Sequence, residues 1–504
     1  MDQTQQPRTV ARRTAVGAVW IMAWRMLNRS LGLVSTLILV RLLEPTDFGL
    51  VAIATGFVTS VDTLSALGVQ DALVREKERS RELYDTGFGL SVLRGVVTAT
   101  LIALVALPIA RFFSEPRLTV VMLVLAGGMI VTSLENIGTV DFRRNLEFDK
   151  EFRLQMVSRV MTTVITIGTA AIFHSYWALV AGIATGRVMR LLQSYTMSDY
   201  RPKFAMGAWR RIIGFSLWTW AFSLLVQARD RADYMVIGYL FNTTSVGLFS
   251  VGAELGMLPT TEVVEPLNRA LFSGFVAGHH REEGPAAMFL GATGLGFLIT
   301  MPAGFGISMI AEPMVRLTLG ERWIAAVPII EILAIASSVT VFSYVCGALL
   351  NALGLPRLTF WLLAVSVVTR FPLLVILLHV WGLSGAAVAI AISLATDQIL
   401  FLWFALPRIG VTIVSLALHI WRPVLATFVM AGTLWACGMA WTATTASGPV
   451  ALIWDSASRA GIGAFVYVVT VGCLWWWSGC TEGPEQIILN ASAGAWRRFC
   501  ARIW

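Results

Sequence analysis

The sequence contains few charged residues for its length. Asp, Glu, Lys and Arg make up 13% of the 504 residues, whereas soluble globular chains carry about 25%. Hydrophobic residues make up 57%, and the mean hydropathy is +0.73. This composition leaves too little charge to cover a water-exposed surface, so it excludes a soluble enzyme and indicates a protein of the lipid bilayer.

Cysteine and histidine are also scarce, with five of each. No two cysteines have the Cys-x-x-Cys spacing of a zinc or redox site, and most lie in or beside apolar segments. His174 and His379 have no clustered partner in the sequence. We therefore expect no metal site, and we interpret the cysteines as inert packing residues: Cys346, Cys437, Cys473, Cys480 and Cys500.

Long apolar runs, by contrast, recur along the whole chain. Each is at least about 18 residues long, enough to cross about 30 Å of hydrocarbon. The first run follows Arg8, Arg12 and Arg13 as a signal peptide would, but it is too long and lacks a cleavage site, so we interpret it as a permanent span. The runs predict an all-α membrane protein with about 14 transmembrane helices. The predicted spans are 16–41, 47–70, 87–111, 117–138, 154–173, 176–199, 212–240, 244–268, 286–311, 326–350, 357–378, 380–406, 416–441 and 457–479.

The distribution of lysine and arginine indicates the orientation of these spans. With the N-terminus inside, the predicted inward segments carry most of these residues, including clusters at 75–81, 143–153 and 201–211. By the positive-inside rule both termini are then cytoplasmic. The net charge of +8 reflects this topology, so we expect no nucleic-acid partner. The predicted outward segments carry only Arg41, Arg111, Arg117, Arg316 and Arg322.

The chain also contains a weak internal repeat. Residues 42–50 (LLEPTDFGL) match residues 240–248 (LFNTTSVGL), roughly 200 residues later. The repeat predicts two six-helix bundles, 1–205 and 206–406, followed by residues 407–504 with an appended helix pair and a cytoplasmic tail. An even number of spans per copy makes the bundles parallel, and two such bundles would enclose a central cavity that opens alternately to either side.

Several arginines lie inside the predicted spans. An arginine at the bilayer centre costs about 3 kcal/mol, so these side chains must face protein or a water-filled cavity. Helical spacing supports a polar face, because Arg25 and Arg29 are four residues apart, as are Gln155 and Arg159. The whole set is Arg25, Arg29, Arg94, Arg159, Arg229, Arg231 and Arg370.

These arginines allow two interpretations. They could pair with buried acids as structural ion pairs, as Arg229 and Asp233 could at i and i+4 on one helix. Alternatively they contact a substrate, and a guanidinium, with its fixed fork of donors, matches phosphate oxygens. That second interpretation indicates an anion such as a diphosphate. We favour it for the four arginines of the first bundle that have no acid one turn away: Arg25, Arg29, Arg94 and Arg159.

Three short motifs occur at residues 42–50 (LLEPTDFGL), 231–238 (RADYMVIG) and 246–249 (VGLF). In the order and spacing of these motifs, the chain resembles the Wzx-type flippases for O-antigen and exopolysaccharide repeat units. The resemblance extends from about residue 14 to residue 406. That family belongs to the multidrug/oligosaccharidyl-lipid/polysaccharide exporter superfamily. The resemblance implies two parallel bundles around a cationic cavity, which export undecaprenyl-diphosphate-linked oligosaccharide from cytoplasm to periplasm by alternating access.

The resemblance also directs the assignment of site residues. Coupling to an ion gradient is suspected for relatives, and here the candidates are Asp62, Asp233 and Asp397. The predicted eleventh span carries Arg370 in place of an acid, so the coupling ion, proton or sodium, stays open, and no other cofactor is expected. The predicted substrate-binding residues are Arg25, Arg29, Arg94, Arg159, Arg231 and Arg370.

Two other functions fit a membrane protein of this kind. A cation-coupled multidrug antiporter shares the architecture but is expected to line its cavity with acids and aromatic residues. A polysaccharide polymerase or ligase needs catalytic groups in a sizeable periplasmic loop, and every predicted outward loop is short. We therefore expect a transporter, not an enzyme, in the bacterial inner membrane. It would serve exopolysaccharide or lipopolysaccharide biosynthesis beside a polysaccharide polymerase and a chain-length regulator.

Overall fold

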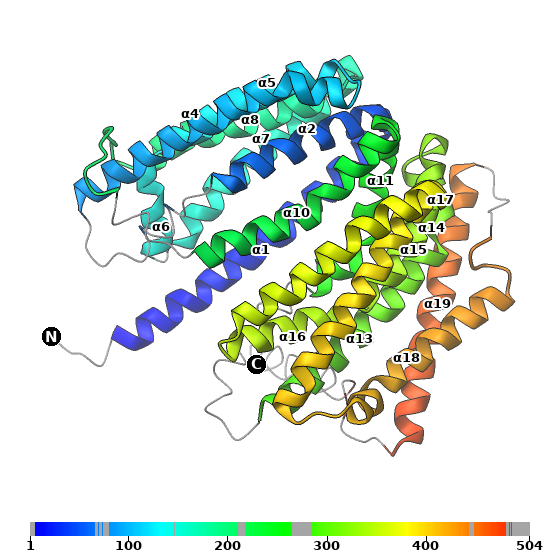
Figure 1. The fold of residues 1–504 in the computed structure, drawn as a ribbon. Helices are drawn as coiled ribbons and strands as arrows, with labels where there is room; N and C mark the ends of the chain where they lie inside the picture. The colour runs from blue at the N-terminus through cyan, green and yellow to red at the C-terminus, as the bar shows by residue number, and fades with distance from the viewer. Residues whose placement is uncertain are drawn as a thin grey trace, which may run out of the picture. The chain divides into compact units, whose positions relative to one another are not determined.

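The computed structural model describes residues 6–65, 69, 73, 80–145, 147–209, 217–264, 284–442, 448–479, 483 and 485. These residues form helices joined by short connections, with no strand among them. The chain divides into two compact units, Met1–Gly247 and Leu248–Trp504, which we describe separately (Figure 1). The domain boundaries predicted at residues 205 and 406 come from the internal repeat, whereas these two units are defined by packing. The predicted boundaries therefore stay a prediction.

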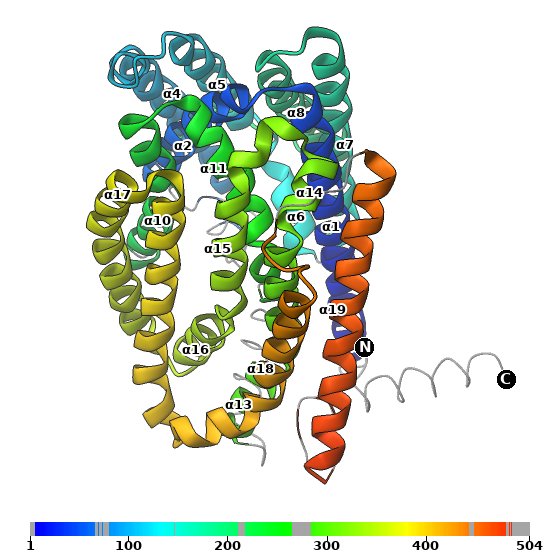
Figure 2. The ribbon, with the colours of Figure 1, turned by 90° about the vertical axis from the view of Figure 1, so that its right-hand side faces the viewer.

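Unit 1 contains the helices up to the start of α11. Helix α7 packs against α8 and α1, α5 packs against α4 and α8, and α2 packs against α5, α4 and α10 (Figures 1 and 2). The elements are α1 (Gln6–Leu42), α2 (Pro45–Leu64), α4 (Arg81–Phe112), α5 (Arg117–Ser133), η1 (Ile137–Thr139), α6 (Val140–Arg144), α7 (Phe148–Phe173), α8 (Trp177–Met197), α10 (Leu217–Leu240) and α11 (Thr243–Gly256), which continues into unit 2.

Unit 2 is organised around α13, which packs against α15, α16 and α18, while α17 packs against α15 and α16. The predicted appended pair is α18 and α19, which lie side by side (Figure 2). The Tyr467 hydroxyl of α19 donates to the carbonyl of Leu298 on α13 at 2.8 Å. The elements are η2 (Thr260–Val264), α13 (Pro285–Met309), α14 (Ala311–Thr318), η3 (Glu321–Ala326), α15 (Val327–Ser338), α16 (Val341–Ala352), α17 (Pro356–Ala405), η4 (Leu406–Ile409), α18 (Ile413–Ala436) and α19 (Pro449–Trp477).

Many of these helices are suited to a bilayer. Among the described residues, seven helices are long and apolar enough to cross a membrane, or nine if each of two bent helix pairs counts as one span. Helix α4 shows the expected surface, since Leu93, Val97 and Leu104 are exposed while Thr98 and Ile102 are buried against neighbours. An apolar outer face of this kind fits lipid. The chain is therefore an all-α membrane protein, and the count of about 14 spans stays a prediction.

Helix α17 is two helices joined at a sharp turn. Gly382 has φ 59° and ψ −142°, which interrupts the helix between residues 356–381 and 383–405. The two arms fold back on each other, and the hydroxyls of Ser366 and Ser393 approach to 3.2 Å. The arms correspond to the predicted spans 357–378 and 380–406.

The motif at residues 42–50 forms the sharp turn from α1 into α2. Buried Asp47 caps this turn, because its carboxylate accepts hydrogen bonds from the backbone N–H of Glu44 and of Tyr176, both at 3.2 Å. The second bond ties the start of α2 to the start of α8. Asp47 therefore holds the starts of α2 and α8 together by accepting hydrogen bonds from backbone N–H groups at both.

The two copies of the repeat motif touch each other through their glycines. A Cβ on Gly49 would overlap the carbonyl of Thr243, and a Cβ on Gly247 would overlap the carbonyl of Pro45. The first turns of α2 and α11 therefore cross with their backbones in contact, which only glycine permits at these two positions.

Candidate functional site

A cavity of about 390 Å³ lies among α1, α2, α5, α7 and α8 in unit 1. Its volume lies in the range of about 300–1,000 Å³ that is usual for ligand pockets. Trp24 and Asn28 of α1 and Thr59 of α2 line part of the wall. The ionisable groups that line it are Asp62, Glu135, Arg159, Arg187 and Arg190.

Helix α7 supplies one polar wall. Gln155, Ser158, Arg159 and Thr162 fall at i, i+3, i+4 and i+7, which places them on one face of the helix, and all four line the cavity. The Ser158 and Thr162 hydroxyls donate to carbonyls one turn earlier, at 3.2 and 2.9 Å, so their polarity is satisfied within the helix. The polar helix face that the sequence predicts at Gln155 and Arg159 thus lines a cavity.

Helix α8 lies very close to α7 because glycine replaces a side chain at two contacts. A Cβ on Gly182 would overlap the hydroxyl of Thr166, and a Cβ on Gly186 would overlap the hydroxyl of Thr162. This approach brings Arg187 and its neighbours on α8 to the cavity wall. Helix α10 contacts one of the lining residues, since Gln227 of α10 donates to the hydroxyl of Thr59 at 3.1 Å.

The two acids of the cavity are each bound to an arginine. Arg94 Nη2 of α4 lies 2.5 Å from Asp62 Oδ1, and Arg190 Nε of α8 lies 2.9 Å from Glu135 Oε2. The first pair joins α4 to α2, and the second joins α8 to the bend that follows α5, so both link separate elements as well as partner charges.

Arg187 has a different environment. Its Nη1 donates to the carbonyl of Leu125 at 2.8 Å, and its guanidinium occupies the space that a side chain on Gly128 would fill. A carbonyl carries only partial negative charge, so this bond orients the guanidinium without cancelling its charge. Arg159 lies against α1, with its Nη2 3.1 Å from the position that a Cβ on Gly32 would take.

The arginines that line the cavity outnumber the acids. Three arginines, Arg159, Arg187 and Arg190, stand against two acids, Asp62 and Glu135, so the charges of the lining side chains sum to a positive value. A fixed cluster of guanidinium groups in a low-dielectric surrounding attracts anions, and it suits phosphate oxygens in particular.

The predicted arginines of unit 1 are partly brought together. Arg159 lines the cavity, and Arg94 adjoins it through Asp62. Arg25 and Arg29 are half-buried on α1, each one residue after a lining residue, Trp24 and Asn28 respectively. Arg231 is half-buried on α10.

The remaining predicted residues lie elsewhere. Asp233 is buried on α10, while Arg370 and Asp397 are buried on the two arms of α17 in unit 2. Arg229 forms an ion pair with the adjacent acid, since its Nε lies 2.9 Å from Asp230 Oδ1, and the structural pair expected between Arg229 and Asp233 stays a prediction.

Three groups of the cavity are not among the predicted site residues, namely Glu135, Arg187 and Arg190. The signal that could have found this wall is the pair Gly182 and Gly186, spaced by one turn immediately before Arg187, which indicates a closely packed helix face.

Metal binding has no support in the part of the chain that the structure describes. No group of three or more His, Cys, Asp or Glu side chains there could hold a metal ion.

Comparison with known proteins adds a family model, curated relatives and solved structures. A model described as polysaccharide biosynthesis protein matches residues 38–328, more than half of the chain. The chain is 23% identical to the succinoglycan biosynthesis transport protein ExoT of Rhizobium meliloti (strain 1021), over 72% of this chain and 73% of that protein. It is 20% identical to the lipopolysaccharide biosynthesis protein WzxC of Escherichia coli (strain K12), over 82% of this chain and 85% of that protein.

Two solved structures show the same fold at low identity. The lipid II flippase MurJ in an inward closed conformation has a TM-score of 0.73 at 12% identity, covering 91% of this chain and 99% of that chain. An inward-facing multidrug resistance transporter of the MATE family has a TM-score of 0.61 at 16% identity, covering 78% of this chain and 98% of that chain.

Proposed function

The chain belongs to the polysaccharide biosynthesis protein family, and from this premise we propose that it is a flippase for lipid-linked oligosaccharide. It carries undecaprenyl-diphosphate-linked repeat units from the cytoplasmic to the periplasmic leaflet of a bacterial inner membrane by alternating access. The names of ExoT and WzxC, which refer to polysaccharide biosynthesis, support this proposal.

The observation that carries the proposal is the excess positive charge of the cavity in unit 1. Arg159 and Arg187 present guanidinium groups that suit the two phosphates of a diphosphate. Trp24 and Asn28 add an aromatic face and an amide, groups that pack against and hydrogen-bond to sugar rings. The cavity thus offers surfaces for both parts of the polar head.

The same charges argue against a multidrug antiporter. A transporter of cationic drugs needs a carboxylate that is available to its substrate. Asp62 and Glu135 line the cavity, but each is bound to an arginine of a neighbouring helix. The likeness to the MATE transporter concerns the fold alone, so the chemistry of the cavity decides between the two functions.

A polymerase or ligase is disfavoured by the connections of unit 1. The turns that join α1 to α2, α4 to α5 and α7 to α8 are short, and His174 in the last of them is exposed. They hold no room for a set of catalytic groups outside the membrane. We therefore infer a transporter that supplies a separate polymerase and chain-length regulator.

Ion coupling centres on three acids. We infer that Asp62 is the foremost candidate, because a diphosphate that binds Arg94 competes for the guanidinium that Asp62 holds at 2.5 Å. Released from Arg94, Asp62 becomes free to take a proton or sodium ion. Asp233 and Asp397 are the alternatives, since both are buried carboxyl groups on helices.

The function is tested by complementation. A strain without this protein is supplied with wild type or with alanine variants of the predicted arginines and of Arg187, and polysaccharide export is scored against protein level. Loss of export with normal protein level supports the proposal. Full export in every single variant and in their combination would contradict the proposal. The set comprises Arg25, Arg29, Arg94, Arg159, Arg187, Arg231 and Arg370.

A further inference from the structure

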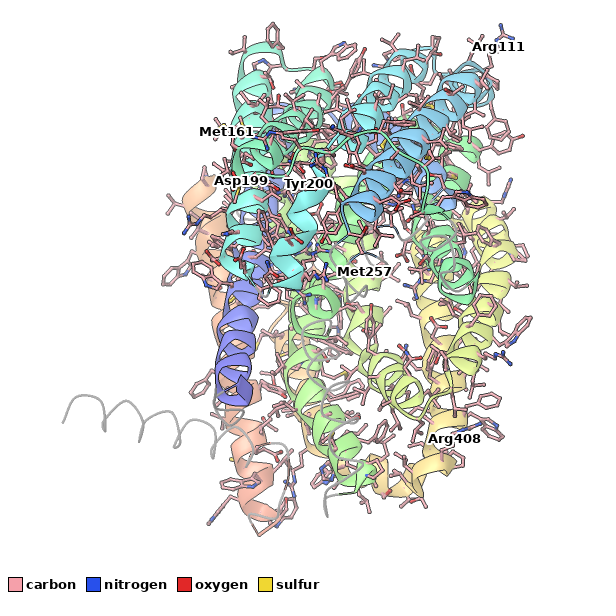
Figure 3. All side chains as sticks on the ribbon, turned by 90° about the vertical axis from the view of Figure 1, so that its left-hand side faces the viewer. Arg111, Met161, Asp199, Tyr200, Met257 and Arg408 are labelled. Atoms are coloured by element: carbon pink, nitrogen blue, oxygen red, sulfur yellow. The ribbon has the colours of Figure 1, made fainter. Side chains whose placement is uncertain are left out.

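A second cavity, of about 450 Å³, lies at the first turn of α4 in unit 1. Its walls come from two segments far apart in the sequence, Ser80, Arg81 and Tyr84 on one side and Asp199, Tyr200 and Arg201 on the other. Asp199 and Tyr200 lie beside each other in Figure 3, at the beginning of the segment that follows α8. This cavity shares no lining residue with the cationic cavity described above.

The segment after α8 is fixed firmly to α4. Buried Asp85 accepts hydrogen bonds from the Tyr200 hydroxyl at 2.7 Å and from the Lys203 backbone N–H at 2.8 Å. Farther along, the Ala208 N–H donates to the Thr86 hydroxyl at 3.2 Å. These bonds hold the wall of the cavity in place, so the cavity is a built feature of unit 1.

Two acids lie behind the wall of the cavity. Asp141 accepts a hydrogen bond from the Tyr84 hydroxyl at 2.6 Å, and Asp85 holds the segment after α8 and also forms a long ion pair with Arg81.

Two guanidinium groups remain at the wall. Arg201 Nη1 donates to the carbonyls of Ser198 and Tyr200, at 2.6 and 3.0 Å, and these acceptors orient the group without neutralising it. The Arg81 side chain is 68% exposed and approaches Asp85 only to 3.9 Å. Among the residues that line the cavity, Arg81 and Arg201 stand against one acid, Asp199, while Asp85 lies behind the wall beside Arg81.

The cavity also lies at the end of unit 1 where the sequence predicts the cytoplasmic side. The neighbouring segment 141–153 carries four basic residues, Arg143, Arg144, Lys150 and Arg153, of which Arg143, Lys150 and Arg153 are ion-paired with Glu151, Glu147 and Asp149. This is the end that the positive-inside rule places in the cytoplasm, where anionic lipid headgroups attract basic residues at about 1 kcal/mol each. A phosphate at the depth of the headgroups is therefore the anion that this cavity meets first.

We propose that the cavity between the first turn of α4 and residues 199–201 binds the phosphate of a resident anionic phospholipid, of the phosphatidylglycerol type. Arg81 and Arg201 contact the phosphate oxygens, and Tyr84 and Tyr200, with ring centroids 5.5 Å apart, form the wall beside the glycerol group. The occupant is distinct from the transported lipid, which shares the phosphate chemistry. The proposal is independent of the flippase function.

Native mass spectrometry of the purified full chain tests the proposal by measuring retention of phosphatidylglycerol, phosphatidylcholine and undecaprenyl diphosphate. We compare wild type with Arg81→Gln, Arg201→Gln and the double variant. Arg153→Gln is the matched control, because the Arg153 side chain is 71% exposed and lies 3.9 Å from Asp149, four residues away, as Arg81 does from Asp85. We expect phosphatidylglycerol affinity to fall about tenfold for each substitution and to stay unchanged in the control.

Three results would overturn the proposal. An equal loss of phosphatidylglycerol affinity in Arg153→Gln would show that the effect comes from general surface charge. Equal retention of phosphatidylcholine would show that no anion is selected. Retention of undecaprenyl diphosphate alone, sensitive to Arg81 and Arg201, would assign the cavity to the transported lipid. The melting temperature of each lipid-free variant identifies misfolding, and Arg81→Gln, at an exposed side chain, decides the outcome if Arg201→Gln unfolds.

Discussion

The arginines around the cavity of unit 1 fall into two kinds. Arg94 and Arg190 are bound to carboxylates of other elements, whereas Arg187 is oriented by a backbone carbonyl. Removal of one member of an ion pair leaves a charge without its bound partner, whereas the hydrogen bond lost on removal of Arg187 is one to a neutral carbonyl. The two kinds should therefore respond differently to substitution.

The pair of Arg190 and Glu135 provides a stability prediction. Arg190→Ala or Glu135→Ala alone leaves one half-buried charge, at a cost between the about 1 kcal/mol of exposed pairs and the about 3–5 kcal/mol of buried ones. The double variant removes both charges and should recover part of the lost melting temperature in detergent. A double variant less stable than both single variants would contradict the account.

Arg187 provides a binding prediction. Arg187→Gln keeps a donor for the Leu125 carbonyl but removes the charge, so we expect the affinity for undecaprenyl diphosphate to fall about 10- to 100-fold while the melting temperature stays near wild type. Arg111→Gln, at an exposed arginine of α4, is the control. An unchanged affinity would remove Arg187 from the site.

Among the elements, the interface of α7 and α8 depends on glycine. Gly182 and Gly186 receive the hydroxyls of Thr166 and Thr162, which sets the distance between the helices and the position of Arg187. We predict that Gly186→Leu separates them and costs about 1–3 kcal/mol through overpacking. The melting temperature should fall, and export should fall with it.

Gly168 on α7 is the matched control for this interface. A Cβ at Gly168 meets nothing within 4 Å, so Gly168→Ala should keep or raise the melting temperature by reducing the entropy of the unfolded chain. If Gly186→Leu were as stable and active as Gly168→Ala, the close approach of α7 and α8 would be irrelevant to the cavity.

The crossing of α2 and α11 gives the second prediction about elements. Gly49→Val inserts a side chain where the Thr243 carbonyl lies, so we expect a lower melting temperature and loss of export. Gly56→Ala, also on α2, has free space for its Cβ and should export normally. Normal export by Gly49→Val would show that the contact between the two motif copies is dispensable.

For the whole molecule, the sequence was sufficient to predict what depends on one segment at a time. Apolar length predicts helices of a membrane protein, and spacing along α7 predicts a polar face with Gln155 and Arg159. The turn at Gly382 also depends on one segment alone, and it lies between two predicted spans.

Partners on different helices could not be predicted in this way. Arg94 has no acid one turn away, and its partner Asp62 lies on α2, so the pair appears only once the helices are packed. The role of Arg190 was hidden for the same reason, because Glu135 follows a different helix. A single sequence contains the period of each helix but not the rotation of one helix against the next.

The central claim is that unit 1 contains a cationic cavity for a lipid diphosphate, and equilibrium binding of undecaprenyl diphosphate to the purified protein tests it most directly. The account predicts binding by wild type that a cationic dye does not displace, and a loss of about 100-fold or more in Arg159→Gln/Arg187→Gln at an unchanged melting temperature. Equal binding by wild type and the double variant would contradict it.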